Sequence, residues 1–296
     1  MTRSGDVATR LYALAEARQH YSKALNALAH LPDTMENRRR RVDSLVRLVT
    51  AAWRSDPPEK NLTRLAEAER LLKELPGPNG TPGGDRLRLA RVHLWMGRTH
   101  YVRGVLREAI GYYQRVLPVA QESGDAEMLA IPSSAIGQAM AIQGHYGKSA
   151  DLLDQAIPLF EQMGNWTEWV RAMSFHGIAL TMMGKCDAGV TETQSALARA
   201  REMNSLTEIA MSNLHLILIY LFSGNLPLAI EAGLQTVEMA ERSGDRVYTY
   251  LGEGLRGWAE SRAGHFEAAK ASLTRSQAAA QELGRSLQLL MGTLRI

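Results

Sequence analysis

The stretches GRTHYVRGVLREAIGYYQRVLPVAQESG (residues 97–124) and GQAMAIQGHYGKSADLLDQAIPLFEQMG (residues 137–164) carry glycine at the same three places. The same interval of 40 residues continues along the chain in three series: Gly104, Gly144, Gly184, Gly224 and Gly264; Gly124, Gly164, Asn204, Gly244 and Gly284; and Gly97, Gly137, Gly177, Ile217 and Gly257. No insertion or deletion interrupts five units. A fixed interval of this length predicts a solenoid of stacked repeats.

Composition narrows the class of protein. Hydrophobic residues make up 45% of the chain and aromatic residues only 6%, which suits helices packed through small side chains. The single cysteine, Cys186, excludes an internal disulfide framework and fits a reducing compartment. The longest dense apolar run, Leu214 to Phe222, is too short to span a bilayer, which needs ~20 residues, and residues 1–6 do not resemble a signal peptide. We therefore expect a cytoplasmic protein without a membrane span.

The net charge of +3 is unevenly distributed. Residues 1–60 hold 11 Lys and Arg against 7 Asp and Glu, and the excess centres on Arg38, Arg39, Arg40 and Arg41. A nucleic-acid groove would normally run along much of a repeat array, so nucleic-acid binding is not expected. We interpret the arginine run as a solvated helix face, with an acidic partner or nucleic acid as the alternative.

Periodicity and breaks divide the chain into four parts. We expect irregular helical repeats at residues 1–75, a Pro- and Gly-rich loop at 76–84, five regular repeats at 85–284 and a truncated further helix at 285–296. Residues 54–61, which contain Pro57 and Pro58, are expected to form a loop. The expected helices are 10–31, 36–53 and 62–75, then 85–102, 105–122, 126–143, 147–163, 166–183, 187–203, 206–222, 227–243, 246–262 and 266–283.

Local signals support these boundaries. Asp125, Asn165 and Asp245 are favourable N-caps, and Ser205 with Glu208 has the spacing of a capping box. Three prolines fall inside expected helices, where each removes a hydrogen bond and clashes with the preceding turn. We expect a bend or an earlier helix boundary at each of them: Pro118, Pro132 and Pro158.

One repeat contains Gly97, Tyr101, Gly104, Ala109 and Tyr113, and this pattern resembles the tetratricopeptide repeat. The resemblance implies an all-α, right-handed α-solenoid of antiparallel helix pairs, here with 40-residue repeats instead of about 34. We attribute the extra length to a longer second helix. The aromatic position fails after Tyr113, because its equivalents are Leu153, Thr193, Gly233 and Leu273.

Two phrases, Leu11-Tyr12-Ala13 and the run from Arg91 to Arg98, resemble bacterial multidomain signalling proteins. In those proteins a cyclase, kinase or DNA-binding module joins a large ATPase, followed by a long tetratricopeptide tail. The resemblance implies a regulatory tail that binds partners or senses inducers. No cyclase or ATPase motif is present in this sequence, so only the role of the tail carries over.

A search for catalytic chemistry finds little. Residues 80–84 lack the Lys-Ser/Thr that a phosphate-binding loop requires. His93 and His100, seven residues apart, lack a third metal ligand, and we assign them, with His176 and His215, a structural role. Cys186 beside Lys185 has no recognisable base. We expect no enzyme activity, no metal and no cofactor.

The first helix of each pair is expected to line the inside of the superhelix. The predicted binding face starts basic and becomes apolar along the array, which suits an amphipathic helix or an extended peptide with an acidic end. Alternatively, Leu214, Leu218 and Leu221 are buried by a tight curl of the array. The predicted contact residues are Arg91, Leu94, Arg98, Tyr101, Gln138, Arg171, Ser174, Ile178, Met211, Leu214, Leu218, Leu251 and Trp258.

These observations predict a non-enzymatic scaffold that binds proteins or peptides. The alternative is a ligand-sensing module for a small molecule or a signal peptide. Two further expectations concern the C-terminal part. Glu253, Arg256 and Glu260 replace apolar residues, so we expect them to be wet or to contact an external partner. Apolar residues within 286–296 are expected to leave an uncapped end that self-associates.

Overall fold

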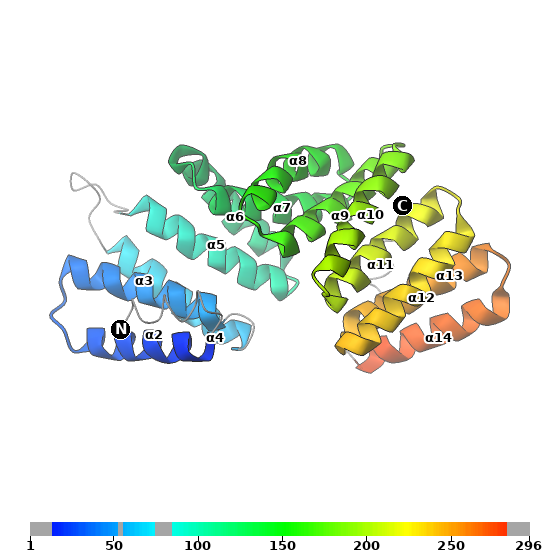
Figure 1. The fold of residues 1–296 in the computed structure, drawn as a ribbon. Helices are drawn as coiled ribbons and strands as arrows, with labels where there is room; N and C mark the ends of the chain where they lie inside the picture. The colour runs from blue at the N-terminus through cyan, green and yellow to red at the C-terminus, as the bar shows by residue number, and fades with distance from the viewer. Residues whose placement is uncertain (1–13, 53–55, 75–84, 283–296) are drawn as a thin grey trace. The chain divides into compact units, whose positions relative to one another are not determined.

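A computed structural model describes residues 14–52, 56–74 and 85–282, and all regular structure in these ranges is α-helical (Figure 1). The described helices are α2 (Leu14–Ala29), α3 (Met35–Ala52), α4 (Pro58–Lys73), α5 (Arg86–Val102), α6 (Leu106–Ser123), α7 (Ala126–Ile142), α8 (Tyr146–Gln162), α9 (Trp166–Met182), α10 (Cys186–Glu202), α11 (Leu206–Phe222), α12 (Leu226–Ser243), α13 (Arg246–Arg262) and α14 (Phe266–Glu282). We call α5, α7, α9, α11 and α13 the A helices, and α6, α8, α10, α12 and α14 the B helices.

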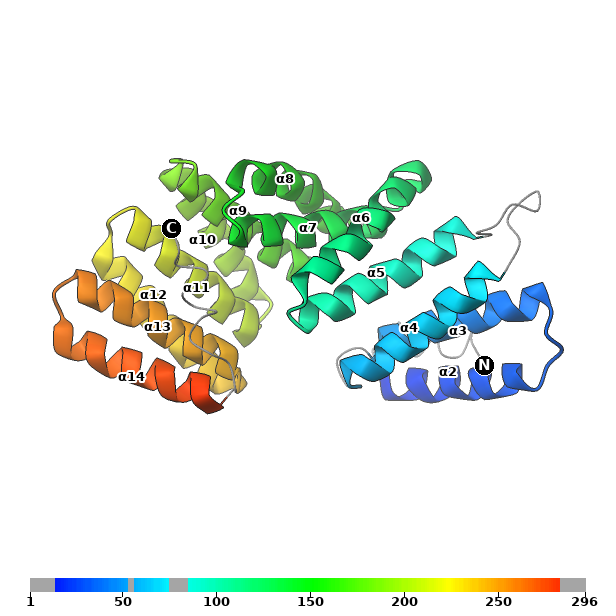
Figure 2. The same ribbon diagram turned by 180° about the vertical axis from the view of Figure 1, so that it is seen from behind.

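The chain divides into two compact units, Met1–Pro132 (unit 1) and Ser133–Ile296 (unit 2). In unit 1, Val49 of α3, Leu65 of α4 and Val92 of α5 belong to one apolar core, and Tyr21 of α2 packs against Leu48. In unit 2, α11 to α14 lie side by side in both views (Figures 1 and 2). The division of the sequence at residues 76–84 and 284 into separate domains stays a prediction.

The turns between the helices explain the glycine intervals. Gly224 joins α11 to α12 with φ +80°, and Gly164 joins α8 to α9 with φ +64°. A side chain strains this left-handed region, and asparagine is among the residues that tolerate it best. Asn204, which interrupts the second glycine series, has φ +51° and is the one non-glycine residue with positive φ in the described chain. The substitution therefore preserves the turn.

The third glycine series lies where an A helix touches its B helix. A Cβ on Gly177 would come within 2.1 Å of Thr193 Oγ1 and 2.7 Å of the Gly189 carbonyl oxygen. Thr193 belongs to the position at which the aromatic pattern fails, and the structure shows that this position faces the glycine. Where Ile217 replaces the glycine, the facing position holds Gly233. The two departures thus occur at paired positions of one repeat, although the side chain nearest to a Cβ on Gly233 would be that of Arg256 in α13, at 2.7 Å.

Helix boundaries agree closely with those expected from the sequence, with two corrections. The A helices have 17 residues and the B helices 17 or 18, so the extra repeat length is shared and not confined to the second helix. The expected loop at 54–61 is also too long, because α4 already begins at Pro58. Proline is well tolerated at the first helical position, where its missing N–H has no partner to lose.

The three internal prolines do not end their helices. Pro118 lies within α6, Pro132 within α7 and Pro158 within α8. Pro118 and Gln114, four residues before it, are both exposed. The carbonyl that loses its partner can therefore bind water, which reduces the cost of the break. Of the two expected alternatives, an earlier boundary is therefore wrong at all three positions, and a bend stays a prediction.

Three of the four predicted caps are confirmed. The side chains of Asp125, Asn165 and Asp245 accept hydrogen bonds from backbone N–H groups in the first turns of α7, α9 and α13. Ser205 differs, because its hydroxyl donates to the carboxylate of Glu208 and caps no backbone group. Glu208 is buried, and the serine satisfies one of its oxygens.

Candidate functional site

The side of each A helix that points away from its B helix is the candidate site. In α9, Gly177 touches α10. At 100° per residue, Phe175 and Met182 lie toward the opposite side, and Ile178 lies at its edge. Equivalent positions in α11 are His215, Leu218 and Phe222, and in α13 Leu255, Trp258 and Arg262. We call the surface formed by these positions on α9, α11 and α13 the A-helix face of unit 2.

This face is largely apolar and partly open to solvent. Ile178, Leu218 and Trp258 are half-buried at the same position of three successive A helices. Phe222 is exposed and its ring meets that of Trp258 edge-on, with centroids 6.0 Å apart. His215 and Leu255 lie deeper on the same side, and Phe175 at the equivalent position of α9 is half-buried. The face therefore presents apolar side chains in register from helix to helix.

The predicted contact residues separate into two groups. Arg91 is exposed, and Arg98, Tyr101, Arg171, Ile178, Leu218, Leu251 and Trp258 are half-buried, so all eight are accessible at the surface. The structure buries the others, which cannot form an open groove surface as expected: Leu94, Gln138, Ser174, Met211 and Leu214. Of the three leucines for which burial was the alternative, Leu214 and Leu221 are buried and Leu218 is not.

In α9, α11 and α13, close packing between successive A helices causes this burial. The Ser174 hydroxyl of α9 lies 3.2 Å from the Ser212 hydroxyl of α11. Arg262 of α13 donates a hydrogen bond from Nη1 to the Leu221 carbonyl oxygen at 3.3 Å. Side chains between neighbouring A helices are therefore enclosed, and only those on the crest remain accessible. Sequence periodicity gives the face of a helix but not the distance to its neighbour.

Polar groups occur near the N-terminal ends of α9 and α11. Arg171 lies 3.6 Å from Glu168 and 3.6 Å from Glu208. Glu208 also accepts the hydrogen bond from Ser205. These polar side chains are satisfied by one another. The A-helix face of unit 2 thus changes from a paired polar end to a mainly apolar C-terminal end, where Met182, Phe222 and the exposed Arg262 lie.

In unit 1 the corresponding side of α5 is basic. Arg88 is hydrogen-bonded to Asp43 and Asp85, and these contacts raise its pKa further above its ordinary value. Arg91 lies 3.5 Å from Asp125, and the Arg98 guanidinium lies 5.0 Å from the centre of the Trp95 ring. Such a cation–aromatic contact holds the charge near the surface.

The arginine run at 38–41 is largely neutralised within unit 1. Arg38 contacts Asp33 at 2.5 Å and Glu74 at 3.4 Å. Arg40 pairs with Glu36 at 3.0 Å, and Arg41 pairs with Glu67 at 2.5 Å. Exposed pairs of this kind contribute little to stability, but they reduce the positive charge available to a partner.

The four histidines have packing or hydrogen-bonding roles. His93 is buried next to Glu69, and His100 stacks on Tyr112 at 5.5 Å. Burial lowers the pKa of both rings. His176 is buried between two carboxylates, with Nδ1 2.5 Å from Glu192 and Nε2 3.4 Å from Asp154. Burial alone would lower its pKa, but these carboxylates outweigh burial and raise it.

His215 differs from the other three. Its ring meets Phe175 edge-on at 4.5 Å, and its buried Nδ1 has no hydrogen-bond partner in the described part of the chain. Burial lowers its pKa to about 4, so the ring is neutral at physiological pH. Sequence reasoning placed His215 among structural residues and missed its position on the A-helix face. Its spacing of 40 from Phe175 was the available signal.

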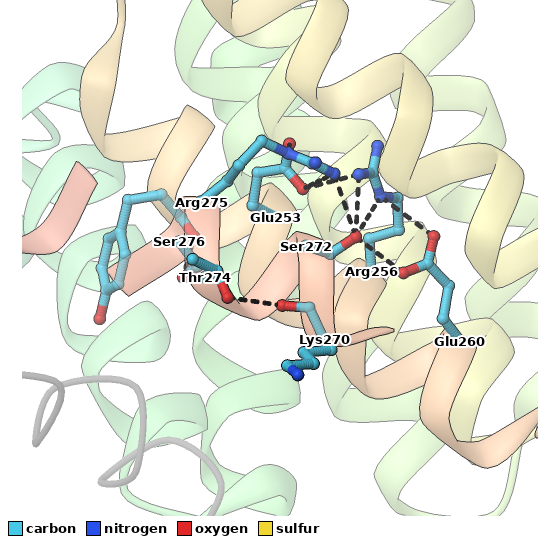
Figure 3. A network of polar contacts seen from close by, with 9 residues as sticks. Glu253, Arg256, Glu260, Lys270, Ser272, Thr274, Arg275 and Ser276 are labelled. Atoms are coloured by element: carbon cyan, nitrogen blue, oxygen red, sulfur yellow. Dashed lines mark hydrogen bonds and ion pairs between the residues drawn. The ribbon is translucent and has the colours of Figure 1, made fainter. Parts of the chain in front are cut away.

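The charged residues of α13 are buried, contrary to the expectation that they are wet. Glu253, Arg256 and Glu260 are only 3%, 7% and 6% exposed. Arg256 pairs with Glu253 at 2.8 Å and with Glu260 at 3.4 Å, as their spacing predicts. Figure 3 shows these side chains around Ser272 of α14, which donates to Glu260 at 2.7 Å.

Residues from three helices make this burial possible. Arg256 donates to the Ser272 hydroxyl at 2.9 Å, and Arg275 of α14 donates to Glu253 at 2.7 Å. A Cβ on Gly233 of α12 would lie 2.7 Å from the Cβ of Arg256. Gly233 therefore provides the space for the arginine stem. We call Glu253, Arg256, Glu260, Ser272 and Arg275 the α13–α14 network.

The described ranges contain neither a metal-binding cluster nor a membrane-spanning helix. No cluster of three or more His, Cys, Asp or Glu side chains in these ranges could hold a metal ion. None of the helices there combines the length and the apolar character that crossing a membrane would require. Cys186 is a half-buried free thiol at the start of α10. The apolar C-terminal segment expected to self-associate lies outside the described residues.

Comparison with known proteins supports the fold. The tetratricopeptide repeat model matches residues 88–162, and no curated protein sequence matches the chain. The chain is similar to a Rap protein complexed with Competence and Sporulation Factor, with 15% identity and a TM-score of 0.72 over 95% of this chain and 75% of that one. It is also similar to NprR in complex with its cognate peptide NprX, with 12% identity and a TM-score of 0.72 over 98% and 84%.

A third similar structure is aspartyl phosphate phosphatase F from Bacillus subtilis, with 14% identity and a TM-score of 0.65 over 92% of this chain and 68% of that one. Identities this low establish similarity of fold only. Together with the repeat match, they show that the chain has a tetratricopeptide-like, all-helical fold built from stacked helix pairs.

Proposed function

We propose that the chain is a non-enzymatic regulatory scaffold that binds a peptide, or a peptide-like segment of a partner protein, on its A helices. The observation that carries the proposal is the register of Ile178, Leu218 and Trp258 on the A-helix face of unit 2. Contiguous apolar surface of this kind is typical of interaction sites. Phe222, 40% exposed beside Trp258, extends it.

The similar structures support a peptide as the ligand. One of them, NprR, is bound to its cognate peptide, and a Rap protein is bound to Competence and Sporulation Factor. An extended peptide crossing parallel helices can place side chains between successive crests. The second candidate function, a sensor that takes a signal peptide and relays its binding to an attached effector, would use the same face. A role as the regulatory tail of a larger signalling protein stays a prediction.

The chemistry of the face favours binding over catalysis. Arg171 contacts both Glu168 and Glu208, and Cys186 starts a B helix without a recognised base. One similar structure is named a phosphatase, so the proposal needs a direct test. Release of phosphate from acetyl phosphate should equal the rate in buffer alone, and a reproducible, protein-dependent rate would contradict a non-enzymatic scaffold.

A display library of random seven-residue peptides tests binding. Because an extended peptide rises about 3.3 Å per residue and packed helices lie about 8–10 Å apart, seven residues can cross α9, α11 and α13. We expect apolar consensus peptides, and we expect Trp258→Ala to abolish their enrichment while circular dichroism shows a folded protein. No enrichment on the wild-type protein, or unchanged enrichment on Trp258→Ala, would contradict the proposal.

The basic face of unit 1 suggests an acidic partner. Arg91 is 53% exposed at its side chain, so its pairing with Asp125 leaves it accessible. Acidic peptides enriched in the same library should be lost on a chain carrying Arg91→Glu and Arg98→Glu. Rim charges act mainly on association rate, so the loss should be greatest at low salt.

A further inference from the structure

His215 is the feature of the A-helix face of unit 2 that packing alone does not explain. It lies between the positions of Phe175 and Leu255, which are apolar. The ring is only 6% exposed, and its Nδ1 is buried without a hydrogen-bond partner. A buried polar group without a partner costs about 1–3 kcal/mol, and native proteins contain few of them.

Two of the other buried atoms without partners have a different setting. Ser149 and Thr193 lie on B helices, at the close contacts with Gly137 and Gly177 of their A helices. Neither is on the A-helix face. His215 is thus a polar group placed at depth within the surface where we propose that a ligand binds.

The surroundings of His215 indicate the chemistry of that ligand. The accessible neighbours Ile178, Leu218 and Trp258 are apolar. Two cations border this region: Arg171 contacts Glu168 and Glu208, and Arg262 donates a hydrogen bond to the Leu221 carbonyl oxygen. His215 itself is neutral at physiological pH because burial lowers its pKa. Around His215 the face therefore offers apolar contacts and one neutral hydrogen-bonding group, and both cations already have partners, so this part of the face favours an uncharged segment.

A peptide on an apolar face needs such a group. Covering this surface removes the backbone N–H and C=O groups of the peptide from water, and an unpaired backbone group is costly there. A neutral imidazole can donate from one nitrogen and accept at the other. The second side-chain torsion of histidine is broad, so ring rotation can turn a nitrogen toward the ligand.

We propose that His215 is the polar anchor of this site, where its neutral imidazole exchanges a hydrogen bond with a backbone amide of an extended, uncharged apolar peptide. This inference rests on the proposed function and specifies the class of ligand and the residue that orients it. The anchor would fix the register of the peptide, while Ile178, Leu218 and Trp258 select its side chains.

The first test uses His215→Phe and a synthetic peptide with the consensus from the seven-residue library. Phenylalanine keeps the ring contact with Phe175 but cannot exchange hydrogen bonds. Losing one neutral hydrogen bond should weaken binding about 3- to 10-fold. Because the variant also removes an unsatisfied buried nitrogen, its thermal midpoint should equal or exceed that of the wild type. His265→Phe, at the exposed N-terminus of α14, is the matched control and should bind normally.

The second test replaces each amide of the peptide by an ester, one position at a time. One ester should weaken binding to the wild type about 3- to 10-fold and leave binding to His215→Phe unchanged. Equal affinity of His215→Phe and wild type would overturn the anchor while leaving the proposed function intact. The anchor would also be overturned if every ester weakened binding to the wild type and to His215→Phe equally. A His215→Phe variant with a lower thermal midpoint than the wild type would overturn it as well. If the library yields no peptide on the wild type, the proposed function and this inference both fail.

Discussion

The helix pairs α11–α12 and α13–α14 have the same backbone plan but opposite interiors. In α11–α12 the contact is apolar, with Leu216 and Ile217 facing a helix that buries Ala229 and Ala232. In α13–α14, Arg256 occupies the position of Leu216 and Ser272 the position of Ala232. Helix α14 buries mainly small or polar side chains, whereas Phe266 and Leu273 are 69% and 46% exposed.

This difference shows that a repeat constrains volume and hydrogen-bond satisfaction more than it constrains polarity. The α13–α14 network places two glutamates and two arginines so that each charge has a partner of opposite sign. A buried ion pair is rarely more stable than an apolar replacement, yet removing one partner is costly. The stabilities of the helix pairs α11–α12 and α13–α14 should therefore respond differently to the same kind of substitution.

The largest effect should come from Arg256→Ala. It removes the arginine that contacts both Glu253 and Glu260, and leaves Glu260 buried without a cation. The expected loss is about 3–5 kcal/mol in the free energy of unfolding, measured by urea denaturation. Arg242→Ala is the control, since Arg242 and Glu238 form an exposed pair, and it should change stability by less than about 1 kcal/mol. Similar losses in both variants would mean that the network is not the cause.

Replacing the polar interior of α13–α14 as a whole should not lower the free energy of unfolding and is expected to raise it. Arg256→Leu, Glu260→Leu and Ser272→Ala together give α13–α14 an apolar contact like that of α11–α12 and leave the Glu253–Arg275 pair in place. This triple variant should match the wild type or exceed it by about 1–4 kcal/mol. A triple variant as unstable as Arg256→Ala would show that polarity itself is required here.

A third experiment tests whether a larger residue on one helix of a helix pair can be compensated by a smaller residue on the other helix. A Cβ on Gly257 would lie 2.8 Å from Leu273 Cγ, so Gly257→Ala should cost about 1–3 kcal/mol through overpacking. Adding Leu273→Ala should recover most of that loss, because it removes the leucine atoms that the new methyl group would meet. Gly147→Ala, with no atom within 4 Å of the new methyl group, is the control. Additive effects of the two substitutions would refute this compensation.

The smallest effect concerns His176, which occupies the same A-helix position as Leu216 and Arg256. Burial lowers its pKa, but Glu192 and Asp154 outweigh burial and the charge of Lys185, so the folded pKa is raised above 6.5. The protonated ring therefore stabilises the fold fully below pH 6.5, and this contribution disappears as the pH rises through the folded pKa. Thermal midpoints from pH 5.5 to 8.5 should show this dependence in the wild type, and His176→Leu should lack it.

Most helix boundaries could be predicted because the glycines report local backbone geometry. A left-handed turn at Gly224, or at Asn204 in its place, is specified by that residue alone. Stacking of helix pairs follows from the fixed interval. The burial of Glu253 and Glu260 could not be predicted in this way. It requires Ser272, Arg275 and the space at Gly233, which lie on other helices.

The candidate site was predictable only in part. Ile178, Leu218 and Trp258 were identified from helical spacing, and the structure leaves them accessible. Met211 and Leu214 share that side of their helices but are buried, because neighbouring A helices approach closely. Helical spacing does not specify that approach. His215 was misjudged for a related reason, since a histidine on an apolar helix is usually satisfied by its neighbours.

The contact between Gly233 and Arg256 also bears on how such an array can be recombined. Gly233 lies on the second helix of one repeat, and Arg256 lies on the first helix of the next. A recombination event at Gly244 would keep both helix pairs intact, but it would place Gly233 and Arg256 in different proteins. If α10 preceded α13, Thr193 would take the place of Gly233 and meet the arginine stem. Residues 206–282 are therefore expected to be exchanged between proteins as one piece, twice the length of the visible repeat.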